Sequence, residues 1–86
     1  MKEIRFSEHS QLKIDVLASR SVIIDLNFVF ETVRSPDKLE TGEEDKLIAQ
    51  KRLDESLVLR VVYRDFGSFI LIITLYPGRR SRHEKD

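Results

Sequence analysis

The sequence predicts a single α+β domain in which two N-terminal helices pack on one face of an antiparallel sheet, in the order β-α-α-β-β-β. The first supporting observation is a pair of β-branched and aromatic runs within residues 57–77, joined by a short turn that contains Gly67. The second is a pair of apolar stripes at helical spacing in residues 8–34. The third is the length of 86 residues, which suits one hydrophobic core.

The chain is expected to begin with a short strand and a helix. Residues 2–6 alternate in polarity and place Ile4 and Phe6 on one side. Ser7 is a suitable N-cap for a helix that runs to about Ser19. The apolar stripe expected to face the core of this helix contains Leu12, Ile14, Val16, Leu17 and Ala18.

A second helix and a strand precede the closing hairpin. Asp25 is a suitable N-cap for the second helix, and Pro36 is expected to end it. Its core-facing residues are Leu26, Val29, Phe30 and Val33. Residues 37–45 are polar and predict a loop, residues 46–53 predict a strand, and residues 54–56 predict a turn.

The turns at residues 54–56 and 65–67 set the predicted strand register. The expected pairs are Arg52 with Val58, Gln50 with Arg60, Arg60 with Ile72, Val58 with Thr74, and Arg64 with Ser68. One face then carries the apolar side chains of Ala49, Leu53, Leu59, Val61, Phe69, Leu71, Ile73 and Leu75. The other face carries Lys46, Gln50, Arg52, Arg60, Arg64, Thr74 and Tyr76, with Ile48, Val62, Ile70 and Ile72 between them.

Two interpretations of this basic face stay open. Antiparallel sheets commonly solvate one face with long polar side chains, and Arg64 beside a turn fits that interpretation. Alternatively, arginines between apolar and aromatic groups form a surface for an RNA backbone or an acidic partner peptide. The four apolar residues within the face favour a bound partner.

Charge and composition narrow the possible partners. The net charge is zero, but residues 1–45 carry six basic and ten acidic side chains, whereas residues 46–86 carry nine and five. The first 78 residues are expected to form the domain, and residues 79–86 a flexible basic tail, which is either simply solvated or steers an anionic substrate. The bases of this tail that we expect to contact a ligand are Arg79, Arg80 and Arg82.

Several classes of protein are disfavoured by the composition. The absence of cysteine excludes disulfides and thiolate metal sites, and no cluster of metal ligands or nucleotide-binding glycine loop is present. We therefore expect no metal and no cofactor. No signal peptide is evident, and no run approaches the roughly 18 apolar residues of a membrane span. A cytoplasmic protein without membrane contact is expected.

Four short motifs occur along the chain: IRFSEHSQLK, SPDKL, LVLRVVYRD and FILIITLYP. Through them, the sequence resembles a small family of uncharacterised domains related to the RelE/ParE toxins of toxin–antitoxin systems, and the similarity covers about residues 1–77. His9 and the segment Thr74-Leu75-Tyr76 match the family pattern, whereas Ser10 and Lys13 stand where alanine and arginine are usual. The resemblance implies an antiparallel sheet packed on two helices, an antitoxin partner and, in relatives that are enzymes, metal-independent cleavage of RNA.

Such cleavage defines a candidate catalytic set. The reaction needs a base for the 2′-hydroxyl, cations for the phosphorane and an acid for the leaving oxygen. Arg60 and Arg52 suit the phosphate, because guanidinium groups bind it bidentately. Tyr76 can stack on a base or donate a proton, and His9, the histidine outside the expected tail, is of the residue type most often used as a general base. The competing structural roles are a sheet-edge aromatic for Tyr76 and a helix-start residue for His9.

Two functions of different classes therefore follow from the sequence. The first is a RelE-like ribonuclease that acts on RNA, either free or on the ribosome. The second is a noncatalytic protein-interaction domain of the same fold, which binds an antitoxin or forms a homodimer. The sequence contains no convincing acid–base pair on one surface, and it leaves both functions open.

Overall fold

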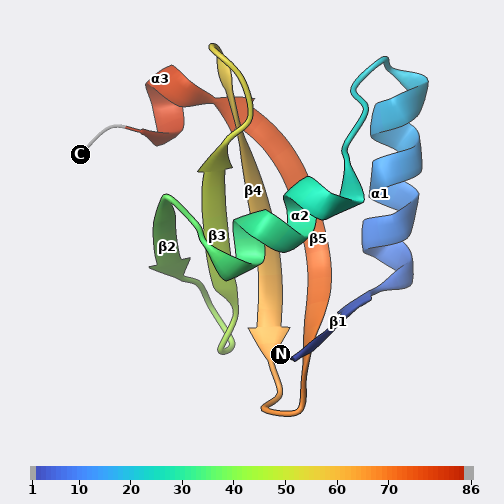
Figure 1. Ribbon diagram of the computed structural model, residues 1–86, viewed down its shortest axis with the longest axis vertical. Helices are drawn as coiled ribbons and strands as arrows, with labels where there is room; N and C mark the ends of the chain where they lie inside the picture. Colours follow the sequence, from blue (N-terminus) through green and yellow to red (C-terminus); the bar gives the residue numbers. More distant parts are fainter. Residues whose placement is uncertain (1, 85–86) are drawn as a thin grey trace.

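The computed structural model describes residues 2–84 and has an α+β fold with a five-stranded mixed sheet (Figure 1). The elements are β1 (Glu3–Phe6), α1 (Glu8–Ser19), α2 (Leu26–Arg34), β2 (Lys38–Thr41), β3 (Leu47–Arg52), β4 (Leu57–Asp65), β5 (Phe69–Arg79) and α3 (Arg80–His83). The strand order is β1-β5-β4-β3-β2. No helix in residues 2–84 is long and apolar enough to cross a membrane.

The α+β class is confirmed, but the expected all-antiparallel sheet is wrong. β1 lies beside β5 in the parallel direction, and only the remaining pairs are antiparallel. β2 forms within the segment that we expected to be a loop, because it pairs with β3 and extends the sheet. The predicted order β-α-α-β-β-β therefore lacks two elements of the observed fold, the strand β2 and the C-terminal helix α3.

Both N-caps expected from the sequence are present. The Ser7 hydroxyl accepts a hydrogen bond from the backbone N–H of Ser10 at 3.1 Å, and the Asp25 carboxylate accepts one from Asn27 at 2.9 Å. These bonds satisfy backbone N–H groups in the first turns of α1 and α2. The Ser7 hydroxyl also donates to the carbonyl oxygen of Ile73, which ties the start of α1 to β5.

The core lies between the sheet and the two helices. Its buried residues are Ile24, Val29, Val33, Ala49, Leu59, Val61, Tyr63, Ile72 and Leu75. α1 contributes Ile14 and Leu17, whereas Leu12 and Val16 are 61% and 38% exposed, contrary to expectation. The inward face of α1 starts instead at buried Ser10, whose small side chain allows close approach to the sheet.

The β4–β5 register differs from the predicted one. The turn is Gly67-Ser68, with a positive φ of 91° at Gly67 and a 2.9 Å hydrogen bond from Phe66 N to the carbonyl oxygen of Phe69. Arg60 consequently pairs with Tyr76 rather than Ile72. The other pairs that the prediction placed wrongly are Val58, which faces Gly78 instead of Thr74, and Arg64, which faces Leu71 instead of Ser68.

A β-bulge changes which side chains of β5 face the helices. The register shifts between Val62 and Tyr63, so that Ile73 of β5 has no partner on β4. Ile70 and Ile72 therefore pack on the core, although we expected them on the basic face. Phe69 and Leu71 turn to the opposite face by the same shift. The β3–β4 pairs Arg52–Val58 and Gln50–Arg60 are as predicted.

Residues 79–84, which we expected to belong to a flexible basic tail after the domain, include the end of β5 and the helix α3. Arg79 is the last residue of β5, and α3 turns back over the sheet face opposite α1 and α2 (Figure 1). The expected tail is thus part of the fold up to Glu84, whose N–H donates to the carbonyl oxygen of Arg80 at 2.8 Å. Residues 85 and 86 of that tail lie outside the described residues.

Candidate functional site

The guanidinium group of Arg60 is buried at the centre of the sheet face opposite α1 and α2. Its residue is only 7% exposed. Nε donates to the Tyr76 hydroxyl at 2.9 Å, one terminal nitrogen donates to the side-chain oxygen of Gln50, and the other donates to the Glu40 carboxylate at 2.9 Å. These partners come from β5, β3 and β2. Arg60 therefore links four strands and has its donors directed at protein groups.

α3 closes over this network. The carbonyl oxygen of His83 accepts a hydrogen bond from the Gln50 side chain at 3.1 Å, and the imidazole lies edge-on to the Tyr76 ring with centroids 6.5 Å apart. The imidazole also rests on Gly78, where an added Cβ would clash with His83 Cδ2. Glycine at position 78 is therefore required for the imidazole to lie this close to β5.

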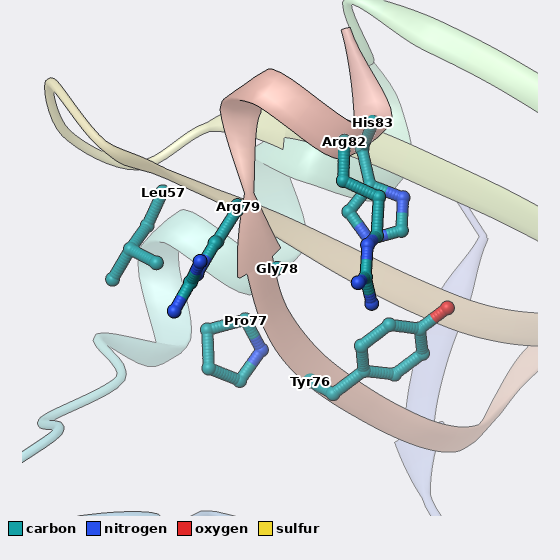
Figure 2. Close-up of a pocket in the computed structure, with 7 residues that line it drawn as sticks. All are labelled: Leu57, Tyr76, Pro77, Gly78, Arg79, Arg82 and His83. Atoms are coloured by element: carbon teal, nitrogen blue, oxygen red, sulfur yellow. The ribbon is translucent and has the colours of Figure 1, made fainter.

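A cleft of about 570 Å³ opens beside this helix (Figure 2). Its lining residues are Leu57, Tyr76, Pro77, Gly78, Arg79, Arg82 and His83. Figure 2 shows Tyr76, Arg82 and His83 on one side of the β5 ribbon and Arg79 on the other, beside Pro77. Because β1 pairs only with Phe69–Ile72 of β5, no strand covers this edge of β5 among the described residues, and the cleft reaches around it.

The charges in and around the cleft favour an anionic ligand. Within residues 2–84, the side chains of Arg79 and Arg82 form no hydrogen bond or ion pair. Burial, together with the nearby Arg60 and Arg82 charges, lowers the pKa of His83 below its usual value of 6.5. The imidazole is therefore neutral at pH 7 and able to accept a proton.

Glu40 balances the charge of the buried arginine. Hydrogen bonds from Arg60 and from Lys38, reinforced by their positive charges, lower the pKa of Glu40. Lys38 Nζ lies 3.2 Å from the Glu40 carboxylate. The carboxylate stays ionised at neutral pH, so the network carries a paired rather than an isolated buried charge.

We expect this pairing to make the fold sensitive to acid. The pKa of the Glu40 carboxyl is lower in the folded than in the unfolded chain. The stability that this ionised group contributes is therefore fully present above its usual pKa of 4.5 and is lost as the pH falls through the folded-state pKa. The lowered pKa of His83 likewise makes the free energy of unfolding decrease as the pH falls below 6.5. Urea unfolding between pH 7 and pH 3 should show that the free energy of unfolding falls less for Glu40→Gln than for the wild type. Glu43→Gln, an exposed control, should follow the wild-type curve; equal curves for all three proteins would contradict the role of Glu40.

The structure brings together only part of the predicted catalytic set. Arg60, Tyr76 and Gln50 share one network, and Tyr76 also lines the cleft with Arg79 and Arg82. His9 is exposed on α1, which packs on the core side of the sheet, so it lies across the sheet from Arg60. The set proposed from the sequence is therefore not a single site.

The remaining predicted residues lie around the network. Arg52 and Arg80 both pair with Glu84, at 3.2 and 2.7 Å, and are thus engaged by α3 and the residue that follows it. Thr74 faces Val62 in the middle of β5, next to Tyr76 on the same face, whereas Arg64 and Lys46 lie toward the end of this face at the β4–β5 turn.

Sequence reasoning missed Glu40 and His83. The alternating segment Lys38-Leu39-Glu40-Thr41 carried a weak strand signal that the surrounding polar residues obscured. His83 gave no usable signal, because its position depends on how α3 folds back onto Gly78.

No protein-family model, curated protein or solved structure matches this chain. The resemblance to RelE/ParE-related domains consequently stays a prediction from short motifs.

Proposed function

We propose that the protein is a RelE/ParE-like, toxin-type domain that binds RNA and cleaves it without a metal ion in the cleft between β5 and α3. One observation carries the proposal: a neutral imidazole, a phenol and two arginine side chains line the same cleft. This combination matches the base, acid and cations that cleavage by the RNA's own 2′-hydroxyl needs.

The roles follow from the surroundings of each group. The His83 imidazole takes the proton of the 2′-hydroxyl, whose oxygen then bonds to the adjacent phosphorus. The bond from phosphorus to the 5′-oxygen breaks, and the Tyr76 hydroxyl gives that oxygen its proton. The products are a 2′,3′-cyclic phosphate and a 5′-hydroxyl end. Proton transfer from His83 back to Tyr76 through water completes the cycle.

Arginines supply the positive charge in two different ways. Arg82 lies on the same side of β5 as Tyr76 and His83 and faces the reacting phosphate, whereas Arg79 on the other side suits the next phosphate along the strand. Arg60 acts as a positioning residue: its Nε donates to the Tyr76 hydroxyl and stabilises the phenolate formed when that group gives up its proton.

Incubation with single-stranded RNA in the presence of a chelator tests the proposal. We expect fragments that end in 2′,3′-cyclic phosphate and 5′-hydroxyl groups. A Tyr76→Phe protein, purified in parallel, controls for contaminating nucleases because it keeps the aromatic ring and lacks the acid. Intact RNA, both free and in the presence of ribosomes, would refute cleavage.

A second candidate is a noncatalytic domain that forms a homodimer, and exposed apolar side chains favour it. Leu12 and Val16 lie one turn apart on the outer face of α1, and Ile23 follows in the exposed segment before α2. We expect such a dimer to dissociate on dilution and Leu12→Asp to stay monomeric, as measured by analytical ultracentrifugation. An antitoxin that covers the cleft is a further partner that we propose by resemblance.

A further inference from the structure

The hairpin turn between β4 and β5 carries a stack of two phenylalanines and two arginines. The rings of Phe66 and Phe69 are 5.1 Å apart and inclined by 21°. The Arg5 guanidinium lies 4.1 Å from the centroid of the Phe69 ring, and the Arg64 guanidinium lies 4.9 Å from that of the Phe66 ring. The bulge in β5 and the Gly67-Ser68 turn together place this stack on the same sheet face as Tyr76.

The two halves of the stack differ in how firmly they are held. Arg5 is fixed over Phe69, because its Nε and a terminal nitrogen donate to the Glu3 carboxylate at 2.9 and 3.2 Å. Arg64 forms no side-chain hydrogen bond or ion pair within residues 2–84. Phe66 is 46% exposed, so part of its ring is accessible to a ligand. The feature of this turn that ring packing alone does not explain is therefore an exposed ring covered by a cation that has no ion-pair partner within residues 2–84.

We propose that Phe66 and Arg64 form a second RNA subsite, which stacks one unpaired base on the Phe66 ring and binds its phosphate through the Arg64 guanidinium. This inference rests on the proposed RNA-binding function and deepens it by naming single-stranded RNA as the ligand. A base replaces the guanidinium on the ring face, and the released guanidinium pairs with the phosphate. Base stacking on an aromatic side chain together with backbone charge neutralisation is the usual mode of single-strand binding.

The path along the sheet from the cleft to this subsite fits one continuous single strand of RNA. Phe69 and Tyr76 are seven positions apart in β5, which corresponds to ~23 Å at the usual rise of a strand. The side chains between them on this face are Val62, Leu71 and Thr74, which are half-buried and uncharged. The ligand that spans both sites is therefore several nucleotides long. An RNA duplex does not offer a free base to the ring, so it is excluded from the subsite.

Binding of a 2′-O-methyl oligonucleotide tests the subsite, because this probe lacks the hydroxyl that cleavage needs. A 12-nucleotide probe that carries one 2-aminopurine is titrated in chelator at several salt concentrations. We expect quenching of its fluorescence when the base stacks on Phe66. Phe66→Ala should weaken binding by roughly 5- to 150-fold, the range for one base–aromatic stack. Arg64→Gln should lower the slope of log K against log salt by about 0.7, as for the loss of one phosphate contact.

Matched variants separate stacking from folding and from general apolar contact. Phe66→Leu keeps an apolar side chain but has no aromatic face, so it should lose the quenching as Phe66→Ala does, whereas Phe66→Trp should keep it. Leu39→Ala, at a 53% exposed leucine on β2, should bind as the wild type does.

Three results would overturn the subsite. They are unchanged affinity of Phe66→Ala and Phe66→Leu, equal affinity for an abasic probe, and equal competition by an acidic peptide, which would indicate a protein ligand. Phe66-dependent binding without any RNA cleavage contradicts only the proposed ribonuclease activity. If RNA is cleaved but neither the cleavage rate nor the affinity for the probe depends on Phe66, only the subsite is contradicted.

Discussion

Replacement of His83 by alanine is expected to lower the rate of RNA cleavage by about 10²- to 10⁴-fold, the usual contribution of a general base. The His83 imidazole lies beside Tyr76 at the cleft. The hydrogen bond from the Gln50 side chain goes to the backbone carbonyl of His83, which the substitution retains. His9→Ala is the matched control, because His9 lies across the sheet and should leave the rate unchanged. The measurement is the initial rate of cleavage of a labelled oligoribonucleotide in chelator.

The dependence of cleavage on pH provides a readout that a merely structural role would not change. Burial and the charges of Arg60 and Arg82 lower the pKa of His83 below its usual value of 6.5, so more of the imidazole is in its basic form at a given pH than in an unperturbed histidine. We expect kcat/KM to rise with pH along a limb centred below 6.5 and then to level off. His83→Ala should abolish this limb. An unchanged limb in His83→Ala, or an equal loss of rate in His9→Ala, would assign the base to another group.

Replacement of Arg60 by methionine is expected to reduce the free energy of unfolding by about 3 kcal/mol, near the low end for breaking a buried ion pair. The substitution leaves the Glu40 carboxylate, the Gln50 oxygen and the Tyr76 hydroxyl without their shared donor. The effect is at the low end because the Glu40 side chain is 36% exposed and can regain water. Urea unfolding at pH 7 measures the change.

A second substitution separates the buried charge from simple loss of packing. In the Arg60→Met background, Glu40→Leu removes the carboxylate that has lost its arginine partner and should recover part of the lost stability, with a coupling of about 0.5–3 kcal/mol. Arg52→Met is the control: its guanidinium pairs with Glu84 at an exposed position and should contribute about 0–1 kcal/mol. Additive effects of Arg60→Met and Glu40→Leu would show that the pair does not act as a unit.

Local signals in the sequence were enough for several features of this protein. Ser7 and Asp25 begin the two helices, because an N-cap side chain bonds to a backbone group only two or three residues away. The alternation of polar and apolar residues in β4 places the Arg60 side chain on one face of the sheet and those of Leu59 and Val61 on the other. The short turn before β4 fixes the Gln50–Arg60 pair.

Tertiary contacts decided where the candidate site lies. The bulge at Val62/Tyr63 exchanged the faces of Phe69 and Ile70, and a change of one residue in register reverses every following side chain. β2 brought Glu40 to Arg60, and the return of α3 onto Gly78 brought His83 to Tyr76. These approaches join residues five to twenty positions apart through hydrogen bonds and packing between separate elements. The sequence by itself determined the two N-terminal helices, the strands β1, β3, β4 and β5, and the face that Arg60 occupies. Only the tertiary structure decided that β2 and α3 form and which groups meet, because a capping bond or an alternating pattern acts within a few residues and carries no information about contacts between distant elements.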